Sequence, residues 1–133
     1  MMLTLKMIRD WLKTLELGAN NFYIGKLDNK LDKSIGVYSS KQTLNPYIAL
    51  GGLASTSFRK KAITFLIHWD KNQDRTEQAA LLFYSKLEEK TNILISGSKT
   101  NYIELLENEP IDVGTDDNGV YERVINAVFY YEK

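Results

Sequence analysis

The one histidine of the chain, His68, is the first side chain to consider for chemistry, because imidazole is the usual general base near neutral pH. It ends an apolar run, and Trp69 and Asp70 follow it directly. The sequence has no cysteine to pair with it, and its serines show no nucleophile-elbow spacing. We therefore interpret His68 as a partly buried histidine at the end of a strand, and we predict no catalytic residue.

The densest acidic cluster of the chain lies near its C-terminus and contains Asp112, Asp116, Asp117 and Glu122. Carboxylates crowded on a loop could hold calcium or magnesium. The spacing matches no calcium loop, because the ligand positions after Asp116 do not alternate and no acid follows at the far end. A hairpin turn also favours Asp-Asp-Asn-Gly. The cluster is therefore predicted to form a turn or an interface, with no metal and no cofactor.

The basic residues give no sign of a site for phosphate or nucleic acid. Gly51-Gly52 is not followed by a Gly-Lys-Ser/Thr sequence, and the run Arg59-Lys60-Lys61 is typical of a solvated flank that protects a strand from edge pairing. Seventeen basic and seventeen acidic residues cancel, so no net charge attracts nucleic acid or a membrane. Eight tyrosines favour protein contacts. The composition indicates a binding or assembly subunit rather than an enzyme.

The acidic cluster belongs to a predicted hairpin at the end of the chain. Asn118-Gly119 is the strongest short hairpin signal, because both residues tolerate positive φ. Residues 120–131 then read as one long strand, rich in Val, Ile, Tyr and Phe and free of Pro and Gly. Neither face of the strand is cleanly polar, so we expect it to have neighbours on both sides and cover on both faces.

A buried strand over residues 61–69 is predicted to carry His68. Ile63, Phe65 and Ile67 alternate on one face of it. Asp74 to Glu77 reads as a capping box with Asp74 in the cap position, opening a helix over about 75–90. The helix is expected to turn inward Ala79, Ala80, Leu82, Phe83 and Leu87. A strand over 92–95 would complete a βαβ crossover.

The remaining elements complete one domain, residues 1–133. A helix is expected over about 4–17, stopped by Gly18, and strands over 21–27, 34–38 and 100–107. Residues 39–57 form the longest stretch without a period, with a short strand at 47–50 inside it. The sum is an α+β fold with a mixed or mainly antiparallel sheet of about six or seven strands and two main helices. No window approaches the roughly 20 apolar residues of a spanning helix, so no membrane contact is expected.

Several stretches resemble one family of proteins from tailed phages. They read NFYIGKLDNKLDKSIGVY, then KAITFLIHWDKN after a Gly-Gly loop, then EQAALLFYSKL, and finally PIDVGTDDNGVYERVINAVFYY. Together they resemble minor capsid proteins of long-tailed phages and prophages of Gram-positive bacteria, which are similar to tail terminator, or tail-to-head joining, proteins. None of these stretches is a catalytic signature.

The resemblance implies a structural role in virion assembly. Such a protein forms a ring, expected to be a hexamer, at the head-proximal end of the tail tube. Its partners would be copies of itself, the tail-tube protein and the head-connector proteins, and DNA would pass through the lumen only as cargo. It would lie at the head–tail junction of the virion, and in the host cytoplasm during assembly.

A closed ring needs two different contact surfaces on each subunit. The candidates are the 39–57 loop and the acidic turn, with interface residues Asp112, Asp116, Asp117, Asn118, Tyr121, Arg123, Tyr47 and Arg59. The alternative that stays open is a metal-dependent enzyme that processes nucleic acid with the acids of residues 112–122. The absence of a basic face for phosphate contacts disfavours this alternative.

Overall fold

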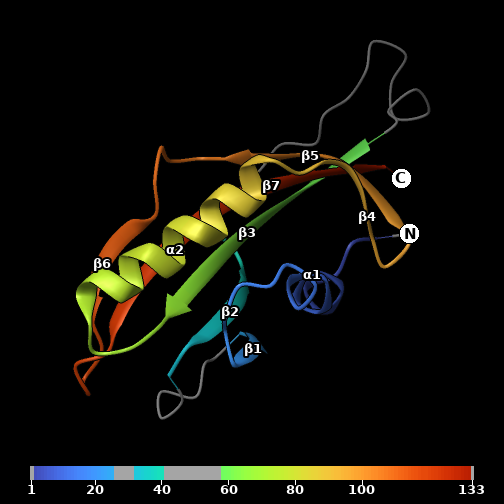
Figure 1. The fold of residues 1–133 in the computed structure, drawn as a ribbon. Coiled ribbons are helices and arrows are strands. Elements are labelled where there is room, and N and C mark those ends of the chain that lie inside the picture. Colours follow the sequence, from blue (N-terminus) through green and yellow to red (C-terminus); the bar gives the residue numbers. More distant parts are fainter. Residues whose placement is uncertain (1, 26–31, 41–57, 133) are drawn as a thin grey trace.

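The structure is a computed structural model that describes residues 2–25, 32–40 and 58–132, and Figure 1 shows its fold. The described residues form one curved sheet of seven strands and two helices that pack on it around one core, which confirms the α+β class. The elements are α1 (Leu5–Leu12), β1 (Asn21–Ile24), β2 (Ser34–Ser39), β3 (Phe58–His68), α2 (Gln73–Glu88), β4 (Thr91–Ile95), β5 (Ser98–Leu105), β6 (Ile111–Thr115) and β7 (Tyr121–Glu132).

The C-terminal strand β7 is the centre of the sheet. The strand order is β1-β2-β3-β7-β5-β4, and β6 pairs with β7 on the same side as β5. Only β1 and β2 run parallel. β3 and β7 stay in register from Phe58 opposite Glu132 to His68 opposite Glu122. The predicted long strand with neighbours on both sides is confirmed.

Both helices cover the same face of the sheet (Figure 1). Ile63, Phe65 and Ile67 of β3 point into this core and are fully buried, as their alternation predicted. The ring centroids of Phe65 and Phe83 of α2 lie 4.9 Å apart, an edge-on geometry that aromatic pairs favour. No described helix or strand lies over the other face of the sheet, so the predicted cover of the C-terminal strand is found on one face only among the described residues.

Helix α1 is shorter than the predicted 4–17. Thr4 caps it, because its Oγ1 accepts a hydrogen bond from the amide of Met7. The helix ends at Leu12, well before Gly18. Leu15 and Leu17 are both buried, whereas a continued helix would place them about 200° apart. The core therefore requires the chain to leave the helix early.

Helix α2 begins and packs differently from the prediction. Its cap is Asn72, whose Oδ1 accepts the amide of Arg75 at 2.9 Å, so Asp74 lies inside the first turn. Either side chain can cap a helix, and the hydrogen bond from the amide of Asn72 to Asp70 Oδ1 places the cap at Asn72. Leu82 is largely exposed, because the buried stripe contains Thr76, Ala80, Phe83 and Leu87.

The predicted βαβ crossover is wrong. β5 and β7 lie between β3 and β4, and three successive antiparallel pairings make β4 run antiparallel to β3. β4 instead forms a hairpin with β5 through Ser96 and Gly97, both at positive φ, as a type I′ turn requires. The predicted strand at 47–50 and most of the 39–57 stretch lie outside the described residues.

Candidate functional site

The acidic turn between β6 and β7 is held together by Asp116. Its Oδ1 accepts the backbone amides of Asn118 and Val120, both at 2.9 Å, and its own amide donates to the carbonyl of Val120. Gly119 adopts φ +82°, which few other residues tolerate. The Asn-Gly hairpin is therefore confirmed, and one oxygen of Asp116 is committed to the turn.

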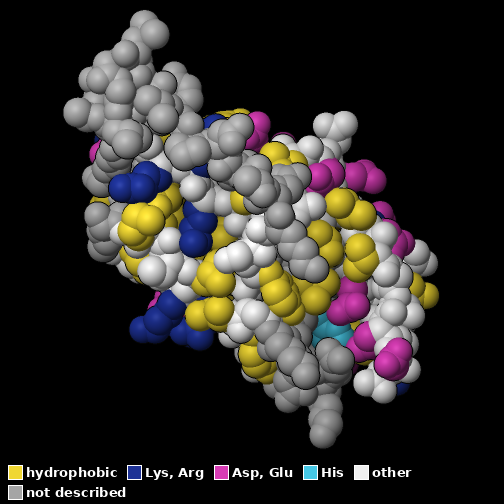
Figure 2. Space-filling view, turned by 180° about the vertical axis from the view of Figure 1, so that it is seen from behind, with side chains coloured by type: hydrophobic (Ala, Val, Ile, Leu, Met, Phe, Trp, Pro, Cys, Tyr) yellow, Lys and Arg dark blue, Asp and Glu magenta, His cyan; other side chains and the backbone are white. Residues whose placement is uncertain are grey.

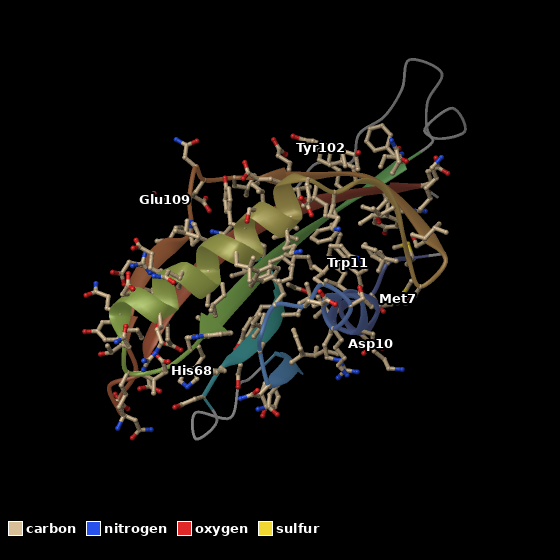
Figure 3. All side chains as sticks on the ribbon, viewed as in Figure 1. Met7, Asp10, Trp11, His68, Tyr102 and Glu109 are labelled. Carbon is tan, nitrogen blue, oxygen red and sulfur yellow. The ribbon has the colours of Figure 1, made fainter. Side chains whose placement is uncertain are left out.

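His68 joins this turn to the end of β3, where Figure 3 places it. The side chain is fully buried; Nδ1 lies 3.0 Å from Glu122 Oε2 and Nε2 lies 3.7 Å from Asp116 Oδ2. Neither Nε2 nor Asp116 Oδ2 has a hydrogen-bond partner among the described residues. Nδ1 is hydrogen-bonded to Glu122 Oε2, whereas the 3.7 Å between Nε2 and Asp116 Oδ2 is too long for a hydrogen bond. The group is enclosed and cannot reach a substrate.

Arg123 supports β6 from the helix-covered face of the sheet. It is nearly buried on the helix-covered face, with one nitrogen 3.7 Å from Glu77 of α2 and another 3.6 Å from Asp112 of β6. Asp112 also accepts the amide of Gly114 at 2.9 Å. Arg123 therefore supports the strand from inside the subunit, and its charge is directed to the protein's own acids.

The same contacts bear on the enzyme alternative. Asp112, Asp116 and Glu122 each bind a partner within the subunit. Among residues 2–25, 32–40 and 58–132, no three His, Asp or Glu side chains are arranged to hold a metal ion. Three of the four acids that the enzyme alternative would use therefore have partners within the fold, and Asp117 is exposed at the tip of the hairpin.

The uncovered face of the sheet has an open hollow of about 460 Å³. Its described lining is Tyr38, Ser39, Ser40, Thr64, Leu66, Val124 and Asn126. Thr64 donates to Asn126 Oδ1 across β3 and β7 at 2.8 Å. No charged side chain is among these described lining residues.

A comparison of the sequence with models of protein families identifies the class of this protein. The model of the family described as "Bacteriophage tail terminator protein" matches residues 3–133. The chain belongs to the bacteriophage tail terminator family. A comparison with curated proteins gives no significant match.

Membership of the tail terminator family makes the chain a structural protein of phage tails. The turn and strand described above are therefore best considered as assembly surfaces. All five residues of β6 are exposed, including Ile111 and Val113, and no described strand pairs with its outer edge. An exposed, partly apolar edge strand is a surface that other chains readily bind.

The candidate interface residues of this family member lie in three places. Asp117 and Asn118 are exposed at the tip of the hairpin, whereas Tyr121 is half-buried and its backbone bonds to Trp69 and Asp70. Arg59 is exposed at the opposite end of β3. Tyr47 lies outside the described residues.

Sequence reasoning missed the contacts that build the site. The pairing of His68 with Glu122 depends on the register of two strands that are 54 residues apart. The contact of Arg123 with Glu77 depends on how α2 crosses the sheet. No local pattern encodes either distance, although the Asn-Gly signal correctly marked the turn.

Proposed function

We propose that this chain forms the ring, a hexamer, that ends the tail tube at its head-proximal end and joins it to the head. The observation that carries the proposal is the match to the tail terminator family over residues 3–133. The proposed partners are copies of the chain, the tail-tube protein and the head-connector proteins. DNA would pass through the lumen as cargo, and the protein would act at the head–tail junction after assembly in the host cytoplasm.

The structure of the subunit supports this role over an enzymatic one. Its sole histidine is buried, and three acids of the 112–122 segment bind partners within the fold. The exposed strand β6 and the turn beside it instead form a surface directed outward. Protein contact is the use that such a surface fits.

Tube growth in the presence of the chain tests the proposal. Purified tail-tube protein should polymerise into shorter tubes as the chain is added, and the chain should be found at one end of each tube by electron microscopy. The heat-unfolded chain is the control, because an unfolded subunit cannot cap. Tubes that grow to the same length with and without folded chain would contradict the proposal.

A further inference from the structure

The charges of this neutral chain are separated along its length. The segment from residue 107 to residue 122 contains six acids and no basic residue: Glu107, Glu109, Asp112, Asp116, Asp117 and Glu122. A second group, at the start of β3 and β5, is basic: Arg59, Lys60, Lys61 and Lys99. Figure 2 shows Lys and Arg toward one side of the molecule and Asp and Glu toward the other.

The acidic turn lies too far from the basic group to neutralise it within one subunit, whereas Glu107 accepts a hydrogen bond from Asn126, which lies opposite Thr64. His68, which lies beside the acidic turn, is seven positions beyond Lys61 along β3. At a rise of about 3.3 Å per residue this is about 23 Å. The Debye length is about 8 Å at physiological ionic strength, so each group acts independently on a partner.

Each group surrounds exposed apolar side chains. We define the acidic end as Glu109, Asp112 and Asp117 with Ile111 and Val113, which are 37% and 49% exposed. We define the basic end as Arg59, Lys60, Lys61 and Lys99 with Leu94 and Tyr102, which are 68% and 52% exposed. Apolar centres within charged rims are typical of protein interfaces.

The basic end extends over both faces of the sheet, because side chains alternate along β3: Arg59 and Lys61 share the face of Ile63, and Lys60 lies on the other. It also includes acids, since Lys99 pairs with Glu132 and Tyr130 donates to Glu104. Lys99 lies opposite Leu94 in the β4–β5 hairpin. Tyr130 of β7 has the ring of Tyr102 on one side, with centroids 5.9 Å apart, and Lys60 Nζ 5.7 Å from its own centroid. β3, β7, β5 and β4 thus all contribute to the basic end.

We infer that the acidic end of one subunit docks onto the basic end of the next copy of this chain. This inference rests on the proposed ring and names its contact. When this contact is used head to tail it is heterologous, and it forms a ring where the rotation between neighbouring subunits closes. Repulsion between like ends disfavours a dimer that pairs the same end of each subunit. The zero net charge of the chain is consistent with this contact, because each subunit carries one acidic end and one basic end.

Four exposed residues allow a charge-exchange test. Glu109 and Asp117 form no ion pair with the residues that the structure describes, and neither does Arg59. Lys99 has only an exposed pair with Glu132, at 3.6 Å, and such pairs add little stability. Glu109→Lys with Asp117→Lys reverses two of the three charges that define the acidic end, and Arg59→Glu with Lys99→Glu cancels the charge of the four residues that define the basic end.

Each double variant alone should need a concentration on the order of 100-fold higher to assemble, because the attraction between opposite charges is lost at every contact. An equal mixture should assemble more readily than either variant alone, because the unchanged acidic end of one variant then meets the unchanged basic end of the other. Native mass spectrometry can count the two variants in each assembly. Lys6→Glu with Lys13→Glu, two exposed residues of the α1 region, changes the net charge equally and is the control for Arg59→Glu with Lys99→Glu. It should assemble as the wild type does.

Two results would overturn the inference in distinguishable ways. If the wild type assembles while the mixture of folded variants does not, or if either variant alone assembles normally, this contact is wrong and the ring stands. If the wild type stays monomeric even with tail-tube protein, the ring itself fails, and the contact fails with it. Circular dichroism of each variant confirms that the subunit is folded in every case.

Discussion

Asp116→Ala should destabilise the subunit through the hairpin, whereas Asp117→Ala beside it should not. Asp116 Oδ1 accepts the amides of Asn118 and Val120, each at 2.9 Å. Alanine leaves the amide of buried Val120 without this acceptor, which costs about 1–3 kcal/mol, and the exposed amide of Asn118 loses a bond worth about 0.5–1 kcal/mol. We expect a total of about 2–3 kcal/mol.

The assay is thermal and urea unfolding of three variants of the turn. A loss of about 2–3 kcal/mol lowers the Tm of a chain of this length by about 10 °C. Asp116→Asn keeps an oxygen acceptor and should cost about 1 kcal/mol or less. Asp117→Ala removes an exposed side chain and should stay within about 0.5 kcal/mol of the wild type.

The comparison of Asp116→Ala with Asp117→Ala tests whether the turn is built around Asp116. Equal losses at the two positions would mean that the turn is not built around Asp116. A wild-type Tm for Asp116→Ala would refute the reasoning outright. It would also release that carboxylate for another role and revive the metal-dependent alternative.

Three further predictions follow from the same packing. Arg123→Met should lower the free energy of unfolding by about 1–2 kcal/mol and speed amide hydrogen exchange in β6. The reason is that the long ion pairs to α2 and β6 are lost, while methionine keeps the apolar part of the side chain. Unchanged exchange in β6 would show that Arg123 does not anchor this strand. In urea unfolding, Phe83→Ala should lower the free energy of unfolding by about 3–5 kcal/mol and Leu82→Ala by less than about 0.5 kcal/mol. Equal losses would show that α2 is rotated about its axis relative to the packing described above. Burial raises the pKa of Tyr84 and Tyr130 above 10.0, so the stability that their neutral forms add is complete below pH 10.0 and is lost as the pH rises through the folded-state pKa. Tyr130→Phe should therefore flatten the alkaline loss of stability, and an unchanged alkaline profile would contradict the assignment.

Local patterns predicted the strands and the turn well. The alternation of Ile63, Phe65 and Ile67 marked a half-buried strand, and Asn118-Gly119 marked the hairpin. Both signals are complete within a few residues, because side-chain direction in a strand and positive φ in a turn are local properties.

The errors come from contacts between distant segments. α1 ends early because Leu15 and Leu17 must both reach the core, whereas the predicted helical stripe contained Leu15 but not Leu17. Leu82 is as apolar as Phe83, and only the position of the sheet determines which of them is buried. The insertion of β5 and β7 between β3 and β4 is likewise a property of the whole chain, which local spacing does not encode.

The candidate site likewise has features that local sequence predicted and features that depend on contacts between distant segments. The acidic turn and the basic run were visible in the sequence, but their positions at opposite ends of one molecule follow from the β3–β7 register. That separation changes two ordinary charge clusters into complementary surfaces.

Light scattering coupled to size exclusion, across a concentration series of the purified chain, tests the ring most directly. We expect a species near the mass of a hexamer of the 15.3 kDa chain, either alone or after addition of tail-tube protein. A monomer at every concentration, unchanged by tail-tube protein, would contradict the ring.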